Sequence, residues 1–287
     1  MASFECRFNS WCRGRPARLR VRIPDADWGE MGFTEAMRHS GAALAPDDCE
    51  GTLAFVPLSG RIQPFDHRPP AKYPVLYLLC GADDDADAWL QRTQVELFCE
   101  ERKIALVLAD PEQGEWHMEK ELRFLNEEVH QFVCAMFPVS ERAEDRFLAG
   151  INRGAGGAIH QMLAYPEAYG AVGLFSSSIT FYEDDPVGLT RDFFRAGKTP
   201  PPVFMAIGAE DRSRYRFHWY KQLLAENGAA VAYEEIPGYG HGYRAANEAL
   251  EDFLNWLPRT DFYAQHLEVN PERADGKARK YRRPEAK

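Results

Sequence analysis

The clearest chemical signature in this chain lies in a glycine-rich turn near its middle. Residues 147–151 are apolar and predict a buried strand, and a helix is expected over residues 156–163. In the pattern G-x-S-x-G, a strained turn of this kind holds a serine nucleophile above a sheet. Here the pattern runs Gly150, Ile151, Asn152, Arg153, Gly154, so both glycines are present and an asparagine stands at the serine position. An amide has no proton that a histidine could remove to make a useful nucleophile.

Two residues further along could supply the rest of a catalytic triad. Asp211 follows a strand expected at 203–208, and His241 follows the last expected strand, at 230–236. Both therefore lie at carboxyl ends of strands, where sites of open α/β sheets form. Either residue alone would be read as an ordinary loop residue. Together with Asn152 they follow the order nucleophile, acid, histidine, which predicts a site where Asp211 orients His241.

The elements that must position these residues alternate along the chain. Continuous apolar runs predict buried strands, and segments with helical periodicity lie between them. Strands are expected at 75–79, 104–109, 146–149, 171–175, 203–208 and 230–236, and helices at 88–102, 119–137, 156–163, 217–226 and 245–257. This alternation predicts the α/β class, with a mostly parallel central sheet and helices on both faces. Alternating patterns add strands at 3–8 and 17–23, and a third strand is expected at 52–56.

The domain organisation is expected to be simple. Residues 1–260 are predicted to form a single domain, in which the weakly patterned segment 24–50 is an insertion. The basic segment 261–287 has no apolar periodicity and is expected to be a mobile tail.

Composition excludes several classes of function. The chain has 287 residues and a formal net charge of −10, which argues against nucleic-acid or anionic-membrane binding. None of its six cysteines forms a CxxC pair, and no signal segment or apolar run of membrane-spanning length is present, so we expect a cytoplasmic protein with free thiols.

The acidic loop Asp83, Asp84, Asp85, Asp87 lacks the glycine and glutamate of a calcium loop. We expect no metal and no cofactor, and the sequence leaves a homo-oligomer open.

Four segments resemble one family of enzymes. Residues 73–81 are similar to its YPVLYLLHG motif, residues 88–96 to SWLxRTNxE, residues 124–139 to its helix ending in FPV, and residues 147–157 to AIAGLSMGG. The family comprises esterases related to esterase D, S-formylglutathione hydrolase and bacterial tributyrin esterases. The resemblance covers roughly residues 70–258 and implies an α/β-hydrolase fold, a carboxylic-ester or acylated small-molecule ligand, and an oxyanion hole formed by main-chain amides of Gly81, Ala82 and Arg153.

The chain departs from the family around the site. Besides Asn152, it has Arg153 where a small or apolar residue is usual, Cys80 in place of a histidine, and Ala155 within the glycine pair. This pattern favours a degenerate carboxylesterase that has kept ligand or partner binding.

Three alternatives remain open on the sequence alone. The protein could be an active ester hydrolase or acyltransferase that uses Cys80 as its nucleophile, or a nearby serine such as Ser177 or Ser178. Deamidation could also turn Asn152 into an aspartate, although the following Arg153 is an unfavourable neighbour for that reaction.

Overall fold

The computed structural model describes residues 1–25, 72–81, 83–111, 116–177, 179 and 185–258. The expected insertion at 24–50, the strand expected at 52–56 and the tail at 261–287 lie outside these residues, apart from Pro24 and Asp25. All elements below belong to one compact unit, formed by the described residues within 1–24 and 72–258.

A mostly parallel sheet of eight strands organises the described residues. Its order is β1-β2-β4-β3-β5-β6-β7-β8, in which β1 and β2 are antiparallel additions and the strands from β4 onward are parallel. The bounds are β1 (Ala2–Ser10), β2 (Arg15–Ile23), β3 (Val75–Leu79), β4 (Ala105–Ala109), β5 (Arg146–Ile151), β6 (Ala171–Phe175), β7 (Val203–Gly208) and β8 (Val231–Ile236). All residues of β3 to β7 are buried, as expected of parallel strands covered on both faces.

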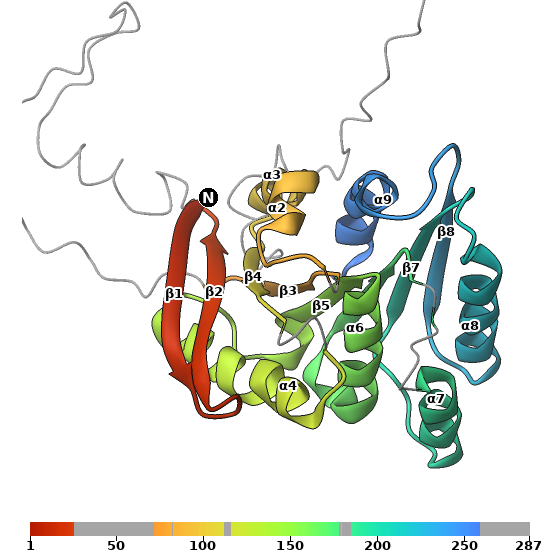
Figure 1. The fold of residues 1–287 in the computed structure, drawn as a ribbon, viewed down its shortest axis with the longest axis horizontal. Helices are drawn as coiled ribbons and strands as arrows, with labels where there is room; N and C mark the ends of the chain where they lie inside the picture. Colours follow the sequence, from red (N-terminus) through yellow and green to blue (C-terminus); the bar gives the residue numbers. More distant parts are fainter. Residues whose placement is uncertain (26–71, 82, 112–115, 178, 180–184, 259–287) are drawn as a thin grey trace, which may run out of the picture. The chain divides into compact units, whose positions relative to one another are not determined.

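Helices cover both faces of the sheet, which confirms the predicted α/β architecture. Figure 1 shows α2, α3 and α9 on one face and α4 and α6 on the other. The bounds are α2 (Ala88–Arg92), α3 (Val95–Glu101), α4 (Glu119–Arg123), α5 (His130–Met136), α6 (Arg153–Ala164), α7 (Pro186–Arg195), α8 (Arg214–Glu226) and α9 (Tyr243–Trp256). No helix among the described residues is long and apolar enough to cross a membrane.

Two of the expected helices differ in detail. The helix expected at 88–102 is broken into α2 and α3 because Thr93 is extended and its hydroxyl donates to the Trp89 carbonyl at 2.6 Å. The helix expected at 119–137 is continuous from α4 to α5 but contains a π-helical segment at Phe124–Val129.

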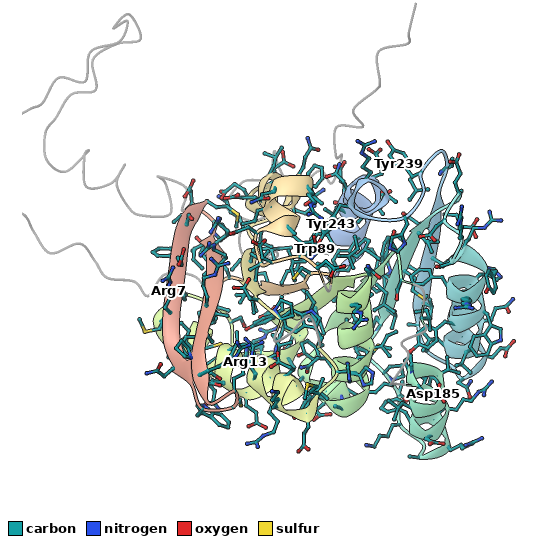
Figure 2. The ribbon with its side chains drawn as sticks, viewed as in Figure 1. Arg7, Arg13, Trp89, Asp185, Tyr239 and Tyr243 are labelled. Carbon is teal, nitrogen blue, oxygen red and sulfur yellow. The ribbon has the colours of Figure 1, made fainter. Side chains whose placement is uncertain are left out.

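Buried carboxylates attach the β1–β2 hairpin to that helix. Glu128 accepts a hydrogen bond from the Ser10 hydroxyl at 2.7 Å and one from the Trp11 N–H at 2.8 Å. The guanidinium of Arg13, labelled in Figure 2 near α4, forms an ion pair with Glu121, and both side chains are almost fully buried. These groups are buried away from water, so leaving any of them without its partner would be costly. The contacts therefore hold the hairpin against the rest of the domain.

Candidate active site

Asn152 occupies a strained turn between β5 and α6. Its φ is 53° and its ψ is −116°. The tolerance of asparagine for left-handed backbone does not explain this conformation, because left-handed helical ψ lies near +30 to +60°. The Asn152 N–H donates to the Phe175 carbonyl at 3.1 Å, and its carbonyl accepts from the Ala155 N–H at 3.2 Å. The turn therefore keeps a costly conformation of the kind found at functional sites.

Two glycines let the backbone close tightly around this turn. A Cβ built on Gly150 would lie 2.1 Å from the Gly154 carbonyl oxygen, and one built on Gly154 would lie 2.2 Å from the carbonyl oxygen of Leu79. Both gaps are too small for any side chain, so the glycines of the G-x-S-x-G pattern allow β5, α6 and the end of β3 to pack together.

Gly154→Ala is expected to lower the free energy of unfolding by about 1–3 kcal/mol, because the new methyl group must push the Leu79 carbonyl at the end of β3 away. Urea unfolding followed by circular dichroism measures this effect. Gly240→Ala is the matched control, since a Cβ there would have no atom within 4 Å. Equal stability of the two variants would contradict this account of the packing.

Asp211 and His241 lie side by side at the carboxyl ends of β7 and β8. His241 Nδ1 lies 2.7 Å from Asp211 Oδ2, and the other Asp211 oxygen accepts a hydrogen bond from the Ser213 N–H at 2.7 Å. The Asp211 side chain is 2% exposed and that of His241 is 44% exposed. A buried carboxylate that holds Nδ1 leaves Nε2 available to accept or deliver a proton at the open side.

One cavity joins these three residues. It has a volume of about 480 Å³ and is lined by Asn152, Glu210, Asp211, Arg212, Ser213 and His241. The structure thus brings together the three residues expected at the site, and adds Glu210, Arg212 and Ser213, which the sequence analysis did not single out. Ser213 stands directly before α8, a position that favours serine. This preference is the signal by which the sequence could have pointed to Ser213.

The structure describes two of the three residues expected to donate to an oxyanion, Gly81 and Arg153. Ala82 lies outside the described residues, and Arg153 begins α6. Gly81 is a neighbour of Asn152, because a Cβ built on it would lie 3.8 Å from the Asn152 amide nitrogen.

Tyr243 is a further residue that the sequence analysis missed. Its hydroxyl donates to Asp84 Oδ2 at 3.2 Å, and its ring packs against Trp89 with 5.3 Å between the ring centroids (Figure 2). Burial, and next the Asp84 carboxylate, raise the pKa of Tyr243 above its ordinary value. The Tyr243 hydroxyl therefore holds the Asp84 carboxylate beside Gly81, since a Cβ built on Gly81 would lie 2.9 Å from Asp84 Oδ2.

The two described candidates for a replacement nucleophile are in unfavourable surroundings. Cys80 is buried, its thiol lies 3.6 Å from the Asp84 carbonyl, and burial raises its pKa well above the ordinary value, so the thiol keeps its proton. Ser177 is also buried, and its hydroxyl oxygen accepts a hydrogen bond from the Ile179 N–H at 3.2 Å. Neither residue lines the cavity at Asn152, and Ser178 lies outside the described residues.

The acidic loop after β3 forms ion pairs with arginines. Asp84 pairs with Arg92 at 2.6 Å, and Asp87 pairs with Arg20 at 2.8 Å. Across the described residues, no group of three or more histidine, cysteine or acidic side chains could hold a metal ion. These carboxylates bind the loop to its surroundings.

Comparisons with known proteins agree with this architecture. The sequence profile of the family described as "Putative esterase" matches residues 57–258. An acetyl esterase from Caldicellulosiruptor saccharolyticus is 22% identical over 227 residues, which cover 64% of this chain and 83% of that protein.

Solved structures of low sequence identity share the fold. S-formylglutathione hydrolase from Staphylococcus aureus superposes with a TM-score of 0.67 at 17% identity, covering 89% of this chain and 98% of that one. A ferulic acid esterase from Anaeromyces mucronatus superposes with a TM-score of 0.61 at 17% identity, covering 88% of this chain and 89% of that one. Since the family profile spans well over half of the sequence, the chain belongs to the "Putative esterase" family and has an α/β-hydrolase fold.

Proposed function

We propose that this protein binds an ester or another acylated small molecule in the cavity at Asn152 without cleaving it. The observation that carries the proposal is the conformation of Asn152, which has φ of 53° and ψ of −116° and lines one cavity with a hydrogen-bonded Asp211–His241 pair. This is the arrangement of a nucleophile turn, with an amide in place of the nucleophile.

The chemistry of the amide decides what such a site does. In the hydrolytic mechanism, the histidine removes a proton from a hydroxyl, which then attacks the ester carbonyl. The Asn152 amide cannot take that role, but its N–H₂ can donate a hydrogen bond and its oxygen can accept one. The site is therefore suited to hold a carbonyl compound, and ester turnover is expected to stay at background.

The other candidate function is an active hydrolase with a different nucleophile. The specific observation in its favour is that Ser213 lines the same cavity as His241. Ser213 lies two residues after Asp211, and its N–H donates a hydrogen bond to that carboxylate. Attack of the Ser213 hydroxyl on an ester would therefore need a geometry unlike that of the turn at Asn152. This makes ligand binding the better-supported function.

Two measurements test the proposal on the purified full-length chain. Hydrolysis of p-nitrophenyl butyrate should not exceed that of the heat-denatured protein, and a fluorophosphonate probe should leave the cavity residues unlabelled by mass spectrometry. Turnover that is lost in His241→Ala, or a label on Ser213, would reject the proposal in favour of an active hydrolase.

The binding part of the proposal needs a separate readout. Ligand-observed NMR with ethyl butyrate should detect binding to the wild type, with the ester intact after incubation. Ser213→Phe should abolish the signal by filling the cavity, and it should leave α8 in place because the Ser213 side chain makes no capping hydrogen bond. Binding that is equal in both proteins, or absent from the wild type, would contradict a ligand site in this cavity.

A further inference from the structure

We propose that Asn152 is a self-processing site, at which the main-chain nitrogen of Arg153 displaces ammonia from the Asn152 side chain and water then opens the product to an aspartate. This inference depends on the local conformation and does not depend on the proposed function. A protein that fails to bind esters could still convert Asn152, and the test below reads mass rather than binding or turnover.

The backbone of Asn152 is already turned for this reaction. Ring closure requires the Arg153 nitrogen to lie on the same side as the Asn152 side chain, with the bond to the nitrogen eclipsing the Cα–Cβ bond. Because the substituents of a tetrahedral Cα are about 120° apart in projection, this occurs only when ψ is near −120°. Helices have ψ near −40° and strands near +130°, so ordinary secondary structure keeps the two atoms apart. At Asn152 ψ is −116°, within a few degrees of the required value.

Two hydrogen bonds make the attacking nitrogen easier to deprotonate. The carbonyl oxygen of Asn152 accepts from the N–H groups of Ala155 at 3.2 Å and Gly156 at 3.4 Å. This carbonyl belongs to the same peptide group as the Arg153 nitrogen, so negative charge formed on the nitrogen is shared with the oxygen by resonance. Donors aimed at that oxygen stabilise the charge, as an oxyanion hole does.

The proposed steps balance as follows. Hydroxide takes the Arg153 N–H proton, and the nitrogen's electron pair forms a bond to Asn152 Cγ. The tetrahedral adduct collapses, the C–N bond to the amide breaks, and water protonates the departing nitrogen to give ammonia and hydroxide. The five-membered imide then adds one water molecule, which breaks one of its two C–N bonds and restores an open chain.

The fold can accommodate the imide. Its nitrogen carries no hydrogen, like that of proline, and Arg153 is the first residue of α6, a position that proline commonly occupies in helices.

The packing of the turn also selects the product. Opening the imide at the main-chain carbonyl would give isoaspartate, which adds a carbon to the backbone. The close approaches of Gly150 to Gly154 and of Gly154 to Leu79 leave no room for a longer turn. In the folded protein we therefore expect aspartate, a carboxylate beside the Asp211–His241 pair.

The chain contains its own matched control at Asn227-Gly228. On sequence alone this site is the more reactive one, because glycine has no side chain to hinder its nitrogen. In the fold, however, Asn227 has ψ of 15°, which turns the Gly228 nitrogen away from the side chain. The Gly228 N–H donates to the Ala225 carbonyl at 3.0 Å, and the Asn227 amide donates to the Leu223 carbonyl at 2.8 Å.

The experiment compares the two sites in native and unfolded protein. Wild-type protein is incubated in mildly alkaline buffer, with and without urea, and peptide mass spectrometry follows the conversion of each asparagine. In the native protein Asn152 should convert at least ~10-fold faster than Asn227, because only at Asn152 does the backbone place the attacking nitrogen on the side of the side chain. In urea the order should reverse. Native conversion at Asn152 that is no faster than at Asn227, or equally fast in urea, would overturn the proposal.

A trapping experiment tests the cyclic route itself. Hydroxylamine added to the native protein should capture the imide, either as a hydroxamate at Asn152 or by cleavage between Asn152 and Arg153. Conversion of Asn152 to aspartate with neither product would mean direct attack of water on the amide, which would overturn the role given to the Arg153 nitrogen.

Discussion

Asn152→Ser is expected to raise kcat/KM for p-nitrophenyl butyrate from background to a readily measured value. The serine would enter a turn that keeps nucleophile geometry and would face the cavity shared with His241, whose Nδ1 is already 2.7 Å from Asp211. Removing the nucleophile of a complete triad costs about 10⁶-fold, and a misplacement of ~1 Å costs about 100-fold. We therefore expect a gain of at least ~10²-fold, well short of the full factor.

Controls separate a restored triad from a nonspecific gain. Asn152→Ser combined with His241→Ala should return to background, because the new hydroxyl would lose its base. Asn152→Ala should also stay at background. No gain in Asn152→Ser, with an unchanged circular dichroism spectrum, would mean that the site has decayed beyond its nucleophile.

The parts of the fold that could be predicted are those set by local patterns. Apolar runs located the strands that became β3 to β7, because parallel strands buried on both faces are apolar throughout. The spacing of Gly150 and Gly154 located the turn at Asn152, since no other residue fits where the backbones touch. The order of Asp211 and His241 relative to the strands predicted which loops would hold them.

The parts that could not be predicted depend on residues far apart in the chain. Tyr243 reaches Asp84 only because α9 packs beside α2, and nothing in the local sequence indicates that contact. Ser213 joins the cavity through the turn that begins α8. The glycine pattern indicates the strained turn at Asn152, but it does not give the value of ψ there, on which the self-processing inference depends; the turn is held by the hydrogen bond from the Asn152 N–H to Phe175 and by the approach of Gly154 to Leu79.

Glu121→Ala is expected to lower the stability of the protein strongly, although Glu121 lies outside the site. Glu121 is fully buried and pairs with Arg13, whose side chain is 3% exposed and whose guanidinium lies 3.6 Å above the ring of Phe124. Arg13 also donates to the main-chain carbonyl of Asp110 at 3.0 Å. The alanine variant would leave the arginine charge buried without its counter-ion, which typically costs about 3–5 kcal/mol. Urea unfolding followed by circular dichroism measures the loss.

The control for this effect is an ion pair on the surface. Glu141 pairs with Lys72 at 2.6 Å, but their side chains are 67% and 55% exposed. Solvent screens such a pair, so Glu141→Ala should destabilise the protein far less than Glu121→Ala. The comparison sets a buried pair against an exposed one, because each substitution removes the glutamate of an ion pair. If the two variants lost similar stability, the Arg13–Glu121 pair would not be what holds the β1–β2 hairpin against α4, and the attachment would have to be assigned to Glu128 and its contacts with Ser10 and Trp11.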